Sequence, residues 1–244
     1  MAPSSPLTAT QRLFVALDTP DVSHAAKLAR ELAEVGCGIK LGLEFFSANG
    51  PAGVEQVAVS APHAPLFLDL KFHDIPNTVA AAVRSALAVK PFILNVHASG
   101  GPAMMKAAAE AARAGSPRPL VIAVTVLTSL DDGDLAAVGQ TPPAADQVVR
   151  LAKLTKAAGL DGVVCSAHEA AGLRKALGPD FKLIVPGIRP AGAAQGDQKR
   201  VMGPADAIRA GADILVVGRP ITEAAHPVAA ARAIIDEIAA TAAK

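Results

Sequence analysis

The sequence predicts a single closed (β/α)₈ barrel, the TIM-barrel fold class, and three observations support this prediction. First, short apolar runs rich in β-branched residues alternate with Ala-rich helical segments, which is typical of βαβ units and a parallel sheet. Second, there are eight such runs, and eight strand–helix repeats fit a closed barrel better than an open sheet. Third, no linker or change in composition separates two domains. An open, doubly wound parallel sheet is the alternative.

The predicted strands are apolar runs of six to nine residues, most of them with Val or Ile at their centre. In chain order they are LFVALD (13–18), GIKLGL (38–43), LFLDLKF (66–72), FILNVHA (92–98), LVIAVTVLT (120–128), GVVCSA (162–167), KLIVPGI (182–188) and ILVVGR (214–219).

Predicted helices lie between these runs, where apolar residues recur at helical spacing among Ala, Lys, Arg and Glu. Clear examples are residues 23–35, 78–89, 102–114, 145–159, 204–212 and 228–243. Residues 1–12 are polar and contain Pro and Ser, so we expect a flexible N-terminal tail followed by the barrel domain over residues 13–244.

Composition argues against several classes of partner. The net charge of +1 gives no basic field for nucleic acid or an anionic membrane, and a chain without Trp or Tyr lacks good base-stacking side chains. No apolar run is long enough to span a bilayer, and the first residues do not resemble a signal peptide. Cys37 and Cys165 are far apart and outside any CxxC pair. We therefore expect a cytoplasmic protein.

The predicted fold indicates where the chemistry lies, because barrel enzymes place their active sites at the carboxyl ends of the strands. Two long, Gly-rich connections, residues 129–143 and 189–200, also leave this end, and loops of this length are often lids. The polar residues at the strand ends, which we expect to converge, are Asp18, Lys40, Asp69, Lys71, His97, Thr128, Ser166, Arg189 and Arg219.

The segment DLKFHDIPNT (69–78) contains the main candidates. Asp69 and Lys71 are two residues apart on a predicted strand, so both side chains face the barrel interior, while Asp74 lies in the turn before a helix that begins at Pro76. A structural ion pair is the alternative interpretation. Lys40 and Asp18 on the two preceding strands favour catalysis, because so many buried charges are costly unless chemistry uses them.

A phosphate site is predicted at VVGRP (216–220), where Gly218 allows close backbone approach and Arg219 offers a guanidinium. The alternative is a surface arginine at the end of the barrel. His73 and His97 are more typical of structural histidines, and no metal-binding spacing is present. DDGD (131–134) is typical of a solvated loop and helix cap rather than a calcium loop.

These motifs together resemble a known family. DLKFHDIPNT, with LFVALD before it and NVHASGG, VTVLTS, GLDGVVCSA, PGIRP, GDQKR and VVGRP after it, closely resembles the bacterial type of orotidine 5′-monophosphate decarboxylase, in order from residue 13 to residue 220. The resemblance implies decarboxylation of orotidine 5′-monophosphate to uridine 5′-monophosphate and CO₂, the last step of de novo pyrimidine synthesis. It also implies that neither a metal nor an organic cofactor is needed.

The resemblance implies a role for each matching residue. Lys71 would donate a proton to C6 of the pyrimidine, and Asp69 would lie beside the departing carboxylate. Lys40 would brace Asp69 and, with Asp18, hold ribose hydroxyls. Asp74 would complete the catalytic set and, with Thr78, would reach into the partner's site of a homodimer. The remaining substrate-binding residues would be Ile75, Thr128 at the base, and Arg189, Gln198, Gly218 and Arg219 around the phosphate and its lid.

This chemistry explains the charges, because decarboxylation at C6 leaves electrons that the ring cannot delocalise, and a fixed ammonium both stabilises and protonates that carbon. Two rival functions remain as alternatives. One is an Mg²⁺-dependent sugar-phosphate aldolase or decarboxylase, which shares a DxK strand motif but not the FHDIPNT continuation. The other is a catalytically silent nucleotide-binding protein, against which the complete set of charged residues argues.

Overall fold

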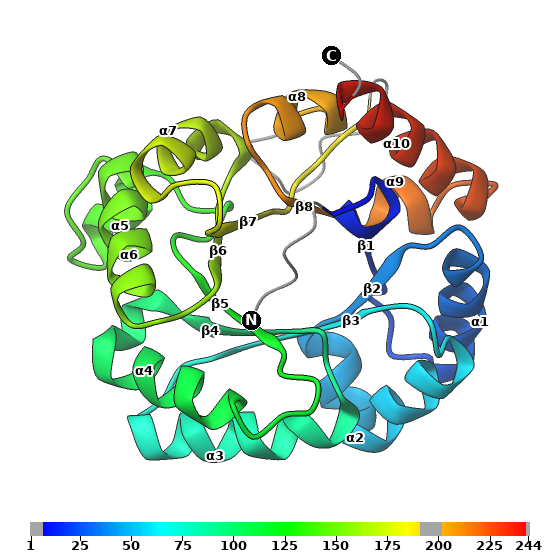
Figure 1. Ribbon diagram of the computed structural model, residues 1–244, viewed down its shortest axis with the longest axis horizontal. Helices are drawn as coiled ribbons and strands as arrows, with labels where there is room; N and C mark the ends of the chain where they lie inside the picture. The colour runs from blue at the N-terminus through cyan, green and yellow to red at the C-terminus, as the bar shows by residue number, and fades with distance from the viewer. Residues whose placement is uncertain (1–6, 191–201, 243–244) are drawn as a thin grey trace.

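The computed structural model describes residues 7–190 and 202–242 and confirms the predicted (β/α)₈ barrel. All strands are parallel, each pairs with its neighbours in chain order, and the last pairs with the first, which closes the sheet. The helices surround the strands in an outer ring (Figure 1). The strands are β1 (Leu13–Ala16), β2 (Gly38–Leu41), β3 (Leu66–Phe72), β4 (Ile93–His97), β5 (Leu120–Val124), β6 (Gly162–Val164), β7 (Lys182–Val185) and β8 (Ile214–Val217).

Helices follow every strand. They are α1 (Val22–Ala33), α2 (Leu43–Ser60), α3 (Pro76–Ala86), α4 (Gly101–Ala112), α5 (Asp132–Ala137), α6 (Ala144–Ala157), α7 (Ala167–Leu177), α8 (Pro204–Arg209), α9 (Arg219–Thr222) and α10 (Pro227–Ala242). Short 3-10 turns are η1 (Thr10–Arg12), η2 (Leu87–Val89) and η3 (Ala98–Gly100). η1 lies within the predicted tail, and Met1 to Pro6 are outside the described residues, so that boundary stays a prediction.

The strand ends differ from the prediction in one consistent way. β3 has the predicted bounds, but the other strands end one to four residues early, as β5 does at Val124 rather than at residue 128. Some of the residues that follow are still apolar and buried, for example Val126 (5% exposed) and Ile188 (0%). At these strands, buried apolar residues therefore continue past the last strand residue into the turn that follows.

Apolar side chains fill both sides of the sheet. The inner cluster includes Phe14 and Phe67, whose rings meet edge to face at 6.4 Å, together with Ile, Leu and Val side chains of the other strands. A Cβ on Gly38 would lie 2.5 Å from the Phe14 ring, so glycine on β2 leaves the space that this ring occupies. The outer cluster packs the strands against the helices and includes Leu68 and Leu70 of β3. The barrel is thus a packed core rather than a pore.

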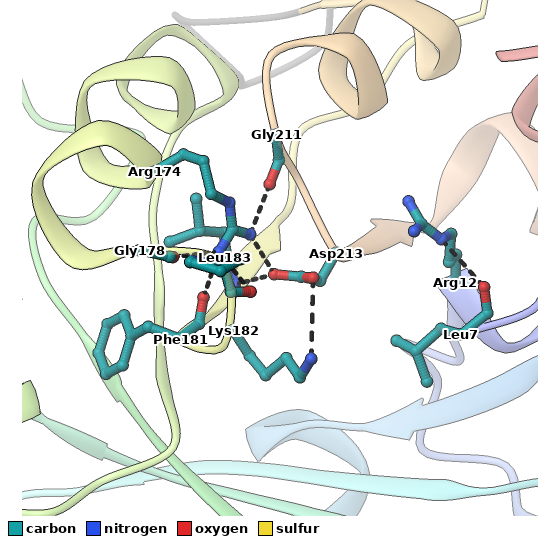
Figure 2. A network of polar contacts seen from close by, with 10 residues as sticks. Leu7, Arg12, Arg174, Gly178, Phe181, Lys182, Leu183, Gly211 and Asp213 are labelled. Carbon is teal, nitrogen blue, oxygen red and sulfur yellow. Dashed lines mark hydrogen bonds and ion pairs between the residues drawn. The ribbon is translucent and has the colours of Figure 1, made fainter. Parts of the chain in front are cut away.

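Two aspartates fasten neighbouring strands at the amino-terminal end of the barrel. Asp213, just before β8, accepts a hydrogen bond from the Leu183 amide of β7 at 2.8 Å and pairs with Arg174 of α7. Figure 2 shows the Arg174 guanidinium between the Asp213 carboxylate and the Gly211 carbonyl, with Lys182 facing the other carboxylate oxygen. Asp161, just before β6, accepts a hydrogen bond from the Val121 amide of β5 and pairs with Arg118. These contacts lie away from the carboxyl ends and are structural.

Within residues 7–190 and 202–242, no helix is both long and apolar enough to cross a membrane.

Candidate active site

Four charged side chains from three adjacent strands meet at the carboxyl end of the barrel. Lys40 Nζ on β2 lies 3.2 Å from an Asp18 oxygen, just after β1, and 3.3 Å from Asp69 Oδ2 on β3. Lys71 Nζ lies 2.6 Å from Asp69 Oδ1. The predicted convergence of Asp18, Lys40, Asp69 and Lys71 is therefore confirmed, as an alternating chain of carboxylates and ammonium groups.

The two central charges are buried: Lys40 and Asp69 are each 8% exposed. Burial by itself would raise the pKa of the Asp69 carboxyl, but Lys40, Lys71 and the amide of Asn95 outweigh it and hold the pKa below its usual range. Burial would likewise lower the pKa of Lys40, but Asp69 and Asp18 outweigh it and raise that pKa. Lys40 and Asp69 therefore stay charged at neutral pH despite their burial.

Lys71 has an unusual backbone. Its φ is +51°, a left-handed conformation that costs a non-glycine residue roughly 1–2 kcal/mol. The conformation belongs to an irregularity in the β3–β4 ladder: Leu68 pairs with Leu94, and the next pair is Phe72 with Val96. The prediction from strand alternation was right about the facing side chains, since Leu70 packs in the outer cluster and Phe72 lies against it. It did not foresee this bulge.

Asn95 is a site residue that sequence reasoning missed. It lies on β4 opposite the bulge; its Nδ2 donates to Asp69 Oδ1 at 2.6 Å, and its Oδ1 accepts from the Lys71 backbone N–H at 2.8 Å. The sequence carried a signal, since Asn95 is the one polar residue within the apolar run FILNV. A buried amide inside a strand needs partners, and these partners are catalytic candidates.

The histidine pair lies beside these charges. The rings of His73 and His97 have centroids 5.6 Å apart. Burial, then His73 and Lys71, lower the pKa of His97, and Asp69 opposes this shift. His97 therefore lies within electrostatic range of the lysine, at the end of β4.

The predicted phosphate side lies next to Asp18. Asp18 and Arg219 line a cavity of about 490 Å³ together with Thr19 and His24. Gly218 directly precedes the short helix α9, in which Arg219 is the first residue. Burial, then the charge of Arg219, lower the pKa of Arg189, which follows β7. The two guanidinium groups therefore lie within electrostatic range of each other.

The other predicted substrate residues are placed less centrally. Thr128 is partly buried in the turn region after β5. Gln198 lies outside the described residues, as does most of the long connection after β7. Asp74, Ile75 and Thr78 are exposed where α3 begins, and Ile75 is 66% exposed. Among the described residues of this chain, these three make no hydrogen bond or ion pair with the four charged groups.

The structural interpretation given to DDGD is confirmed. Asp131 and Asp134 of DDGD form a reciprocal capping box at the start of α5, as a helix cap was predicted to do. Ser166, one of the polar residues expected at the strand ends, caps α7 in the same way with Glu169. In the described part of the chain, no group of three His, Cys, Asp or Glu side chains could hold a metal ion.

Comparison with known proteins gives the same family as the site. A model of the orotidine 5′-phosphate decarboxylase / HUMPS family matches residues 11–234. The chain belongs to this family. The curated orotidine 5′-phosphate decarboxylase of Rhodospirillum rubrum is 57% identical over 231 residues, which is 93% of each chain. That of Shewanella sediminis is 54% identical over 223 residues, or 91% of this chain and 94% of the relative.

Solved structures of orotidine 5′-phosphate decarboxylases share the architecture. The enzyme from Lactobacillus acidophilus has a TM-score of 0.81 at 35% identity, covering 93% of this chain and 99% of its own. The one from Pyrococcus horikoshii has a TM-score of 0.74 at 25% identity, with 93% and 98% covered. The resemblance found in the sequence motifs is thereby confirmed. These relatives all carry the decarboxylase name, and nothing among them favours the Mg²⁺-dependent alternative.

Proposed function

We propose that this protein decarboxylates orotidine 5′-phosphate to uridine 5′-phosphate and CO₂, the final step of uridine 5′-phosphate synthesis, and that Lys71 is the proton donor. The observation that carries the proposal is the chain Asp18–Lys40–Asp69–Lys71, which holds one ammonium in place before substrate arrives. A preorganised charge requires no reorganisation when charge develops in the transition state.

The reaction balances without a redox partner. The bond between C6 and the carboxylate breaks, CO₂ leaves, and the electron pair stays on C6. The Lys71 ammonium stabilises this pair and then transfers its proton to C6, after which the neutral amine regains a proton from water. Asp69 lies 2.6 Å from the Lys71 ammonium and keeps it oriented toward the reacting carbon. Lys40 braces Asp69 from its other oxygen.

The remaining residues are proposed to bind the substrate away from C6. Asp18 and Lys40 hold ribose hydroxyls, and Thr128 contacts the base. Arg219, with the Gly218 backbone and Arg189, takes the phosphate; the cavity that Arg219 and Asp18 line together supports the part assigned to Arg219. Gln198 would clasp the same phosphate from the connection after β7.

We further propose a homodimer with shared active sites. Asp74, Ile75 and Thr78 are exposed on one protomer and would complete the site of its partner. Ile75 supports this, because 66% exposure of a large apolar side chain beside two polar ones fits an interface. The cytoplasmic location stays a prediction from the sequence.

The test is conversion of orotidine 5′-phosphate by wild type and by Lys71→Ala, measured as uridine 5′-phosphate formed. Lys71→Ala should lower kcat by more than about 10²–10⁴-fold, because it removes the proton donor and the positive charge together. Lys90→Ala is a matched control, because Lys90 also has a positive φ, of 47°, but is exposed and follows η2. This variant measures the effect on kcat of replacing a lysine in the left-handed conformation away from the charged chain. More than about a tenth of wild-type kcat in Lys71→Ala would exclude the proposed role.

A further inference from the structure

Asn95 occupies a position that the ladder between β3 and β4 leaves open. Leu68 pairs with Leu94 and Phe72 pairs with Val96, so three residues of β3, from Asp69 to Lys71, lie opposite Asn95 alone. The strand therefore has more backbone groups than its neighbour can pair. Asn95 is 1% exposed, so its own amide has to find its partners within the protein.

The side-chain amide of Asn95 makes two hydrogen bonds to this surplus segment of β3. Its oxygen accepts from the Lys71 backbone N–H, at 2.8 Å, in the residue with left-handed φ. Its nitrogen donates to Asp69 Oδ1, at 2.6 Å, the same oxygen that accepts from the Lys71 ammonium. One side chain thus fixes the backbone from which Lys71 projects and the carboxylate toward which Lys71 points.

An amide suits this double task at neutral pH. A carboxylate accepts but does not donate, and an alkyl group does neither. An amide also adds no charge to a site where Lys40 and Asp69 are already buried.

We infer that Asn95 is a positioning residue for the reaction: through its two hydrogen bonds it holds Lys71 and Asp69 in the geometry needed for protonation at C6. This inference rests on the proposed function. Asn95 itself touches no reacting atom, so its effect reaches the substrate through Lys71 and Asp69.

The first experiment compares Asn95→Ala with Thr155→Val. Thr155 is also a fully buried polar residue, but it donates to the Leu151 carbonyl of its own helix α6, outside the catalytic machinery. Asn95→Ala should lower kcat about 100-fold, the usual cost of misplacing a catalytic group by about 1 Å. Its KM and its affinity for uridine 5′-phosphate should change less than about threefold, since the binding groups remain. Thr155→Val should keep wild-type kcat.

The second experiment uses Asn95→Asp, which keeps the shape and the acceptor but loses the donor and places a second carboxylate beside Asp69. When the new carboxyl is protonated it can donate to Asp69 as the amide did. The ratio of its kcat to that of wild type should therefore rise as pH falls from about 8 to 5. The surrounding titratable groups are Asp69 and Lys71 on β3, Lys40 on β2 and the His73–His97 pair. Wild type contains the same groups, so the ratio of the two kcat values reports only the pH dependence that the new carboxyl introduces.

The outcomes separate this inference from the proposed function. If wild type does not decarboxylate orotidine 5′-phosphate, the function itself is wrong. If wild type is active and Asn95→Ala keeps more than about a third of its kcat, the inference is overturned and the function stands. A pH-independent ratio for a folded Asn95→Asp overturns it too, as does failure of both variants to fold, which would assign Asn95 to barrel stability alone.

Discussion

At the scale of single residues, the Asp69 carboxylate accepts from side chains of three strands: Lys40 on β2, Lys71 on β3 and Asn95 on β4. Each partner favours the ionised form, which is why the pKa of Asp69 is lowered despite burial. A lowered pKa stabilises the fold above the pKa of the unfolded chain, about 3.9, and the stabilisation disappears as pH falls through the folded value. The raised pKa of Lys40 works in the opposite direction, and its stabilisation is lost at alkaline pH.

Acid titration of stability tests this coupling. We expect the free energy of unfolding of wild type to fall below about pH 4 and Asp69→Asn to show a shallower acid slope, because the unfolded chain no longer binds that extra proton. Denaturant unfolding at several pH values measures both slopes. Asp236→Asn, an exposed carboxylate on α10, should follow wild type. Identical acid slopes for wild type and Asp69→Asn would contradict the lowered pKa.

Arg219 belongs to the same scale, because its proposed partner is one group of the substrate. Arg219→Ala should lower kcat/KM on orotidine 5′-phosphate about 10- to 100-fold, since a charge-assisted hydrogen bond is worth roughly 1.5–3 kcal/mol. Remote binding energy helps to orient the reacting carbon, so wild type should lose most of its activity on phosphate-free orotidine. Steady-state kinetics with both substrates, and with the exposed Arg232→Ala as control, measure this. An equal loss of kcat/KM on both substrates would show that Arg219 does not bind the phosphate.

At the scale of elements, the period of two along strands placed Asp69 and Lys71 on one face, and the shared barrel end brought Lys40 and Asp18 to them. Both rules need only sequence spacing. The β3 bulge could not be predicted from the spacing of β3 alone. Only the register with β4 shows that Asp69 to Lys71 lie opposite a single residue. Strand ends were overestimated because Val126 and Ile188 are as buried in turns as they would be in strands.

The Arg174 contacts predict that the amino-terminal end of the barrel contributes to stability rather than to catalysis. Arg174→Ala should reduce the free energy of unfolding by about 3 kcal/mol, because it leaves the largely buried Asp213 carboxylate without its guanidinium. The kcat should stay at the wild-type level, since these contacts lie at the end of the barrel opposite the charged chain. Denaturant unfolding gives the stability, with the exposed Arg113→Ala as control. A large fall in kcat with unchanged stability would mean that the two ends are coupled.

At the scale of the whole molecule, the proposed homodimer makes each active site depend on two chains. Asp74 is exposed in its own protomer, where its carboxylate accepts a hydrogen bond from the next amide, that of Ile75. The sequence predicted this shared active site only through the family resemblance, because no spacing rule shows which surface contacts a partner subunit. Gln198 lies outside the described residues, and its proposed role likewise rests on the resemblance.

Subunit mixing tests the shared site. Lys71→Ala and Asp74→Ala should each be nearly inactive, and their heterodimer should carry one site with both lesions and one with neither. Equal amounts that exchange at random should therefore regain about a quarter of wild-type activity. Activity is followed after mixing, and heterodimer formation is verified with two affinity tags. Inactive mixtures with proven heterodimers would place Asp74 in the site of its own chain.

The irregular pairing of β3 also has a consequence for protein engineering. A designer who grafts the four charged side chains onto an idealised barrel, with β3 and β4 in uninterrupted register, would give the lysine an extended backbone and a different approach to the ligand. The transferable unit is therefore larger than the charges: it comprises the surplus length of one strand, the left-handed lysine and the amide across from it. A graft that carries all three should reproduce the lysine–aspartate contact at 2.6 Å, and one that carries the charges alone should not.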